Sequence, residues 1–145
     1  DADGILLSPV LDEALGPGCH FPSGEDQDLN NRALRAGYDV LCDPSILVTH
    51  WGGRAYGDEA NRLLRGYSRG IGALAAKDVR LGSVTGVYPL IRELSVELRF
   101  AAAAVVRPAA APFVLRSPWL IQGLWQGMRA PLDRRAALFG PERAT

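Results

Sequence analysis

The stretch that decides the fold runs from Phe21 to Tyr38 and reads FPSGEDQDLNNRALRAGY. It begins with residues that cap helices, Ser23 and Gly24. Apolar residues then repeat at helical spacing, at Leu29, Ala33 and Ala36. Gly37 is a typical helix stop. The pattern predicts a helix over residues 25–36, with three acids in or near its first turn, Glu25, Asp26 and Asp28.

These acids stand where a helix favours negative charge. The first-turn N–H groups have no partner within the helix, and the positive end of the helix dipole lies beside them. One of the carboxylates can therefore serve as a base near neutral pH. Simple capping is the alternative, because acids are common in first turns. Helix chemistry alone leaves both interpretations open.

The residues after the helix have the composition of short strands. Residues 39–43 and 45–49 are separated by Pro44 and lead directly into His50. We expect a pair of strands over 39–49, followed by a glycine-rich loop over 51–57 that carries Trp51 and Arg54.

Several spaced motifs in this order resemble the acceptor-side half of the family 2 glycosyltransferases: Leu15-Gly16-Pro17-Gly18, Ser23-Gly24-Glu25-Asp26, Leu34-Arg35-Ala36-Gly37-Tyr38, Asp43-Pro44 and Val48-Thr49-His50. The resemblance is clear from about Leu11 to Arg54 and continues more weakly to about Leu81. It implies an α/β fold, the C-terminal part of a GT-A type nucleotide-diphosphosugar transferase, followed by amphipathic helices. The family's metal-binding Asp-x-Asp stands well upstream of its Glu-Asp pair. Asp1-Ala2-Asp3 lies too close to that pair, so the nucleotide-binding half is expected to be missing from this chain.

The resemblance also implies roles for the acids. Asp26 corresponds to the general base that takes the proton of an acceptor hydroxyl during a single inverting displacement. Glu25 is expected to orient the loop or to contact the acceptor, and Asp28 to be a capping or surface acid. The implied partners are a nucleotide-diphosphosugar donor and a glycan or lipid-linked acceptor.

Three residues after the strand pair are candidate ligand contacts. His50 is a candidate ligand for a divalent metal, Mn or Mg, although a histidine that closes a strand can equally hydrogen-bond a backbone carbonyl. Arg54 suits a diphosphate, or it is a solvated loop charge. Trp51 suits stacking on a sugar, or it is a core residue.

Composition limits the remaining classes of fold and function. The chain has 145 residues, a formal net charge of +0 and 48% hydrophobic residues, which indicates one modest ordered domain and gives no electrostatic reason to bind nucleic acid. The spacing of Cys19 and Cys42 matches no metal knuckle and favours free thiols in a reducing compartment. No secretory signal is visible, so a cytoplasmic location is expected.

We divide the chain into an acceptor-side part, 1–81, and an amphipathic helical tail, 82–145. The first part should end in a helix over 58–77, weakened by Gly66, Gly70 and Gly72. In the tail, helical spacing continues over 87–128, and prolines interrupt it before it could span a bilayer. Four tail residues are expected to be partly exposed: Trp119, Leu120, Leu124 and Trp125.

The tail therefore suggests peripheral contact with the inner face of a membrane through residues 87–128, with an ordinary packed hairpin as the alternative. A different function follows if the acidic loop is only scaffold. The chain would then be a non-catalytic module that binds a membrane or a partner protein.

Overall fold

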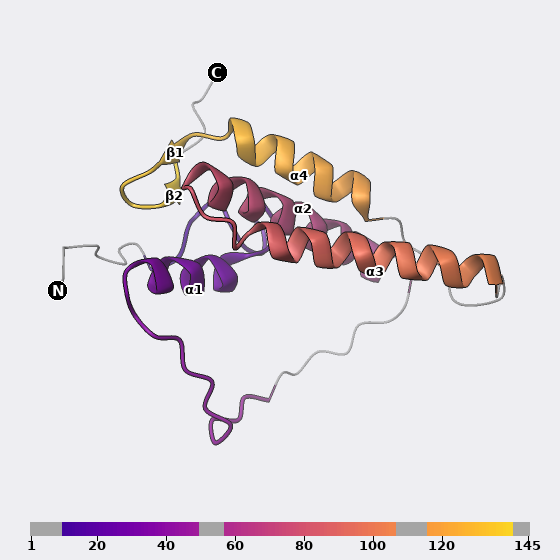
Figure 1. The fold of residues 1–145 in the computed structure, drawn as a ribbon, viewed down its shortest axis with the longest axis horizontal. Coiled ribbons are helices and arrows are strands. Elements are labelled where there is room, and N and C mark those ends of the chain that lie inside the picture. Colours follow the sequence, from indigo (N-terminus) through magenta and orange to yellow (C-terminus); the bar gives the residue numbers. More distant parts are fainter. Residues whose placement is uncertain (1–9, 50–56, 107–115, 141–145) are drawn as a thin grey trace.

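The computed structural model describes residues 10–49, 57–106 and 116–140, which are mostly helical (Figure 1). The regular elements are α1 (Glu25–Arg35), α2 (Asp58–Arg80), α3 (Val87–Val106), α4 (Ser117–Arg129), β1 (Leu132–Asp133) and β2 (Leu138–Phe139). The two strands form one antiparallel pair in which Leu132 faces Phe139. No helix in these ranges is long and apolar enough to cross a membrane.

The boundaries of α1 confirm the predicted helix to within one residue. Gly24 precedes it with a φ of 100°, a left-handed conformation that favours glycine. Gly37 follows it with a φ of 83°, and its N–H donates to the carbonyl of Leu34. Tyr38 N–H donates to Ala33, so the last carbonyls of the helix are satisfied as in a Schellman motif.

Helices α2 and α4 pack closely because both carry glycine at their contact. A Cβ atom added to Gly72 would lie 2.1 Å from the carbonyl oxygen of Leu120, and one added to Gly123 would lie 2.0 Å from that of Arg69. Any larger residue would push the helices apart. The expectation that the glycines only weaken α2 was therefore incomplete, since at Gly72 the small residue permits the packing. Leu120, expected to be partly exposed, is fully buried in this contact.

A small core lies at the end of α2 near the strand pair. Leu15 and Phe21 pack there with Ala73 and Phe139, and the centres of the Phe21 and Phe139 rings lie 5.0 Å apart. Leu15 and Phe21 also form an isolated β-bridge, which closes the loop before α1. This core joins residues on both sides of the domain boundary expected after residue 81.

The strand pair expected over 39–49 is not formed. Residues 38–49 contain no strand, and in Figure 1 they run away from the helices as an extended trace. Their apolar side chains are exposed, with Leu41 at 88% and Leu47 at 89%. A strand is stabilised by ladder hydrogen bonds to a neighbour, and the described residues supply none here. Within residues 10–49, 57–106 and 116–140, the predicted α/β class is thus represented by helices and the small β1–β2 pair.

Candidate functional site

The mouth of α1 is held in place by the loop that precedes it. The Ser23 hydroxyl, expected to cap α1, instead donates to the carbonyl of Tyr67 on α2 at 3.3 Å. A Cβ atom on Gly70 would lie 2.0 Å from that hydroxyl oxygen, so only glycine lets the loop approach α2 this closely. The start of α1 therefore has a fixed position against α2.

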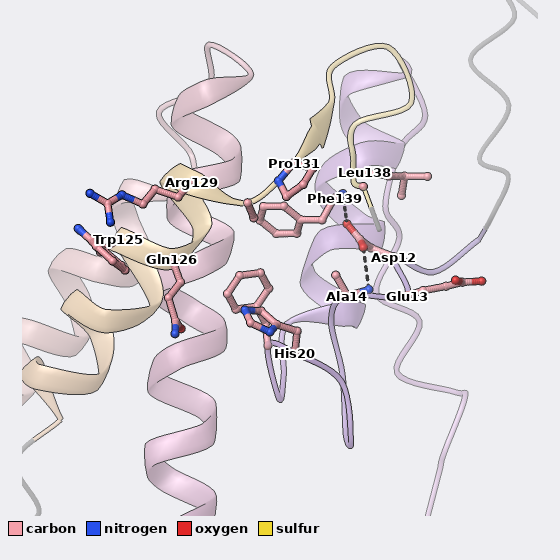
Figure 2. A pocket seen from close by; sticks show the side chains of 13 residues that line it. Asp12, Glu13, Ala14, His20, Trp125, Gln126, Arg129, Pro131, Leu138 and Phe139 are labelled. Carbon is pink, nitrogen blue, oxygen red and sulfur yellow. Dashed lines mark hydrogen bonds between the residues drawn. The ribbon is translucent and has the colours of Figure 1, made fainter. Parts of the chain in front are cut away.

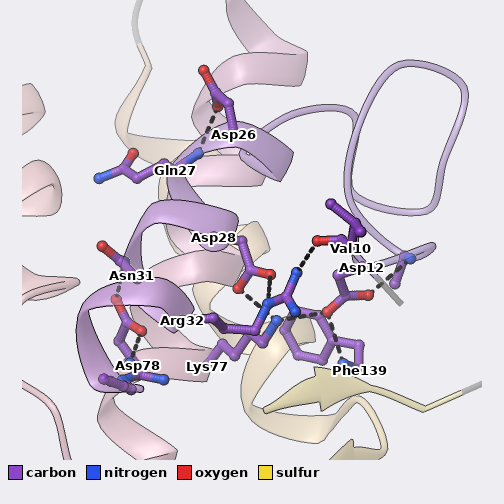
Figure 3. Close-up of polar contacts among 12 residues, drawn as sticks. Val10, Asp12, Asp26, Gln27, Asp28, Asn31, Arg32, Lys77, Asp78 and Phe139 are labelled. Atoms are coloured by element: carbon purple, nitrogen blue, oxygen red, sulfur yellow. Dashed lines mark hydrogen bonds and ion pairs between the residues drawn. The ribbon is translucent and has the colours of Figure 1, made fainter. Parts of the chain in front are cut away.

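Asp26 is exposed at this helix mouth. One of its carboxylate oxygens accepts the N–H of Gln27 at 2.7 Å. Figure 3 shows the side chain turned away from the buried charges on the other face of the helix. Within the described residues it has no basic partner. This carboxylate can therefore accept a proton or a hydrogen bond from a molecule that reaches the helix mouth.

Glu25 differs from Asp26 in being half-buried. Its carboxylate lies beside the turn that contains Gly16 and Gly18, and the carboxyl carbon is 3.5 Å from where a Cβ atom on Gly16 would stand. Both glycines have positive φ angles, 115° and 83°. The carboxylate thus lies against a turn whose backbone conformation favours glycine.

Asp28, expected to be a capping or surface acid, is buried in a cluster of charges that also contains Asp12, Arg32 and Lys77 (Figure 3). Lys77 is 0% exposed and donates to Asp12 and Asp28, at 2.6 Å each. Arg32 donates through Nε to Asp28 at 2.9 Å. The two acids and two bases have no net charge. The expectation for Asp28 was wrong because these buried cations make its desolvation tolerable.

This charge cluster joins segments that are distant in sequence. Asp12 accepts the N–H of Ala14 at 3.0 Å and that of Phe139 at 2.8 Å. The cluster therefore connects the loop before α1, both helices α1 and α2, and strand β2. Its sequence signals were weak: an Asp28–Arg32 pair at helical spacing, and Lys77 directly after the apolar residues 73–76.

A second charged contact holds the C-terminal half of α1 to α2. Asp78 forms an ion pair with Arg35 and accepts a hydrogen bond from the Asn31 amide at 2.9 Å. Burial raises the pKa of Asp78 above its ordinary value, and the Arg35 guanidinium opposes that shift. Helix α1 is thus fixed to α2 along its length, while Asp26 remains open.

A pocket of about 720 Å³ lies apart from Asp26, between the loop before α1, the end of α4 and the β1–β2 pair (Figure 2). Its aromatic lining comes from His20, Phe21, Trp125 and Phe139. Arg129 places its guanidinium carbon 3.6 Å from the centre of the Trp125 ring. Asp26 does not line this pocket, so the pocket is not the predicted reaction site.

The other predicted site residues, His50, Trp51 and Arg54, lie outside the described residues. The cleft that Asp26 was expected to share with His50 therefore remains a prediction. Within the described ranges, no group of three or more His, Cys, Asp or Glu side chains is arranged to hold a metal ion. Both cysteines, Cys19 and Cys42, are free thiols, as expected.

No protein-family model, curated protein or solved structure matches this chain. Its function is therefore inferred from the sequence motifs and from the geometry of the described residues.

Proposed function

We propose that this chain is the acceptor-side part of an inverting glycosyltransferase of the family 2 type, with Asp26 as the general base. The observation that carries the proposal is the contrast between the two faces of α1. One face is fixed by buried ion pairs, and the other presents an exposed carboxylate that has no ion-pair partner among the described residues, within the Ser23-Gly24-Glu25-Asp26 motif. Rigid placement of an accessible base is what general base catalysis requires.

In the proposed reaction, Asp26 takes the proton of an acceptor hydroxyl on a glycan or lipid-linked sugar. The hydroxyl oxygen forms a bond to the anomeric carbon of a nucleotide-diphosphosugar, and the bond from that carbon to the diphosphate breaks. The electron pair leaves with the nucleoside diphosphate, and the configuration inverts. The enzyme needs no covalent nucleophile for this single displacement.

The rest of the proposal follows from the family resemblance. Glu25 would orient the neighbouring turn or contact the acceptor, Trp51 and Arg54 would contact substrate, and His50 would help to hold a divalent cation, Mn or Mg. The nucleotide-binding half of a GT-A fold would come from protein outside this chain. The proposed location is cytoplasmic, peripheral on the inner face of the membrane.

The test is sugar transfer by a protein that joins this chain to a nucleotide-binding half. Changing Asp26→Asn should lower kcat by about 10²- to 10⁴-fold, because the amide cannot accept the proton. The donor dissociation constant, measured by calorimetry with and without Mn or Mg, should be nearly unchanged, because the base acts in the transition state.

Asp58→Asn is the matched control. Asp58 is also an exposed aspartate in the first turn of a helix, and that helix also begins after a glycine with positive φ. It should retain full activity. An Asp26→Asn variant that transfers sugar at the normal rate would remove Asp26 from the proposed role.

A second candidate function is a non-catalytic module that binds a membrane or a partner. Exposed apolar side chains on α3 and α4 favour it, among them Leu98, Val105, Ile121 and Trp125. Vesicle binding without any sugar transfer in the joined protein would support this alternative.

A further inference from the structure

Helix α3 buries its acids and exposes several of its large apolar residues, the reverse of an ordinary surface helix. Its two acids, Glu93 and Glu97, are both buried against the start of α4. Glu97 accepts the backbone N–H groups of Arg116 and Ser117, at 3.2 and 2.8 Å, and so caps α4 from a neighbouring helix. Glu93 pairs with the Arg116 guanidinium at 2.7 Å. The acidic side of α3 is thus occupied within the protein.

A different side of α3, about 110° around the helix from the acids, presents an apolar stripe to solvent. The stripe consists of Ile91, Leu94, Leu98 and Val105, whose exposed fractions are 59%, 41%, 71% and 85%. Their spacing of three, four and seven residues places them on one face of the helix. At a rise of about 1.5 Å per residue the stripe is about 21 Å long. In Figure 1 the C-terminal part of α3 extends past the start of α4.

Two exposed arginines, Arg92 and Arg99, lie on a further side of α3, about 100° around the helix from the stripe. Arg92 and Arg99 each follow a stripe residue by one position and are both exposed. A guanidinium nitrogen of Arg92 lies 3.4 Å from Glu93 Oε1, and 64% of the Arg92 side chain remains exposed to solvent. The exposed charges of α3 are therefore both positive, because both acids of the helix are buried.

We propose that α3 is a membrane-contact helix that lies flat on an anionic lipid surface. The stripe would enter the boundary between headgroups and acyl chains, and Arg92 and Arg99 would bind lipid phosphates. Charge favours an anionic lipid over a purely apolar partner, because the exposed charges of α3 are both positive and can reach lipid phosphates while the stripe is inserted. This inference does not rest on the proposed glycosyltransferase activity. It assigns the contact to α3 rather than to Leu120 of α4, which is buried.

The experiment is co-sedimentation of the purified chain with phosphatidylcholine vesicles, with or without phosphatidylglycerol. The unchanged protein should bind the anionic vesicles, and binding should fall as salt is raised. The double variant Ile91→Gln/Leu98→Gln should lose most of the binding. Arg92→Gln/Arg99→Gln should weaken binding to anionic vesicles by roughly 30-fold at low salt, about 5-fold for each charge.

The matched control is Ile46→Gln/Leu47→Gln, which removes two apolar side chains of the same types that are even more exposed, from the extended segment. It should bind like the unchanged protein. Circular dichroism should show the same helix content in all variants, because glutamine is a good helix former.

Three outcomes would overturn the proposal. One is equal binding of Ile91→Gln/Leu98→Gln and the unchanged protein. Another is equal binding to neutral and anionic vesicles. The third is self-association in sedimentation velocity that Ile91→Gln/Leu98→Gln abolishes, with no vesicle binding, since the stripe would then bind a second copy.

Discussion

Residues 10–35 and residues 38–49 are neighbours in sequence, yet they place their side chains in opposite environments. The first region buries charge, with Asp12, Asp28 and Arg32 nearly inaccessible to water. The second region exposes apolar groups, with Ile46, Leu47 and other large side chains in solvent.

The difference shows that partners decide burial at least as much as residue type does. Lys77 Nζ lies 2.6 Å from each of the buried acids. Backbone N–H groups complete the hydrogen bonding of Asp12, and Arg32 Nε completes that of Asp28. The apolar residues of 38–49 have β-forming composition, but no neighbouring strand among the described residues. Desolvation is favourable only where a complementary surface exists, for charges and for apolar groups alike.

The largest expected effect comes from removing the central cation of the buried cluster. Lys77→Met keeps a similar volume but leaves two buried carboxylates with only Arg32 as a cation. We expect a loss of about 3–5 kcal/mol in the free energy of unfolding, because an unpaired buried charge is costly. Urea unfolding followed by circular dichroism measures it.

Arg62→Met is the control, because Arg62 lies on the exposed face of the same helix. It should change stability by less than about 0.5 kcal/mol. Should Lys77→Met fail to fold, adding Asp12→Asn should restore folding, because the remaining buried charges, Asp28 and Arg32, then balance each other. A Lys77→Met protein as stable as the original would show that the cluster does not hold α1 in place.

The sequence predicted elements that depend on local signals. The limits of α1 followed from its acidic first turn and Gly37, and α2 began at the expected residue, Asp58, although it continues to Arg80 rather than to 77. Helical spacing over 87–128 corresponds to α3 and α4. Features that depend on distant contacts were missed. The strand pair over 39–49 was wrong, because strand formation requires a neighbour that composition does not reveal.

The candidate site shows the same limit. Asp26 and Asp28 have the same side chain and stand two residues apart on one helix, so local pattern could not separate an exposed acid from a buried one. The local Asp28–Arg32 spacing gave a weak hint, and the approach of Lys77, from 49 residues away, completes the burial of Asp28. Leu120 was likewise expected to be partly exposed, because nothing local showed that Gly72 would let α4 come so close.

A smaller effect is expected where α2 and α4 touch. Gly123→Ala would place a Cβ atom 2.0 Å from the carbonyl oxygen of Arg69, which is backbone and cannot rotate away. We expect a net loss of about 1–3 kcal/mol in the free energy of unfolding, because the helices must separate. Thermal unfolding measured by circular dichroism checks this.

Gly66→Ala is the matched control within α2. Its Cβ atom would lie 3.3 Å from the side chain of Pro22, a contact that a small shift relieves. Alanine favours a helix over glycine by up to about 1 kcal/mol, so this variant should be neutral or slightly more stable. Equal destabilisation by both substitutions would mean that the α2–α4 contact is looser than described.

The smallest effect is expected in the exposed segment, and it tests the contrast with the buried region directly. Leu47→Ala should change the free energy of unfolding by less than about 0.5 kcal/mol, because the side chain is already in water. Leu74→Ala, at a leucine that is 1% exposed on α2, should cost about 2–5 kcal/mol. Both values come from urea unfolding of the isolated chain. A loss of unfolding free energy at Leu47 comparable to that at Leu74 would show that residues 38–49 pack against the protein. The contrast between this segment and the buried region would then be wrong.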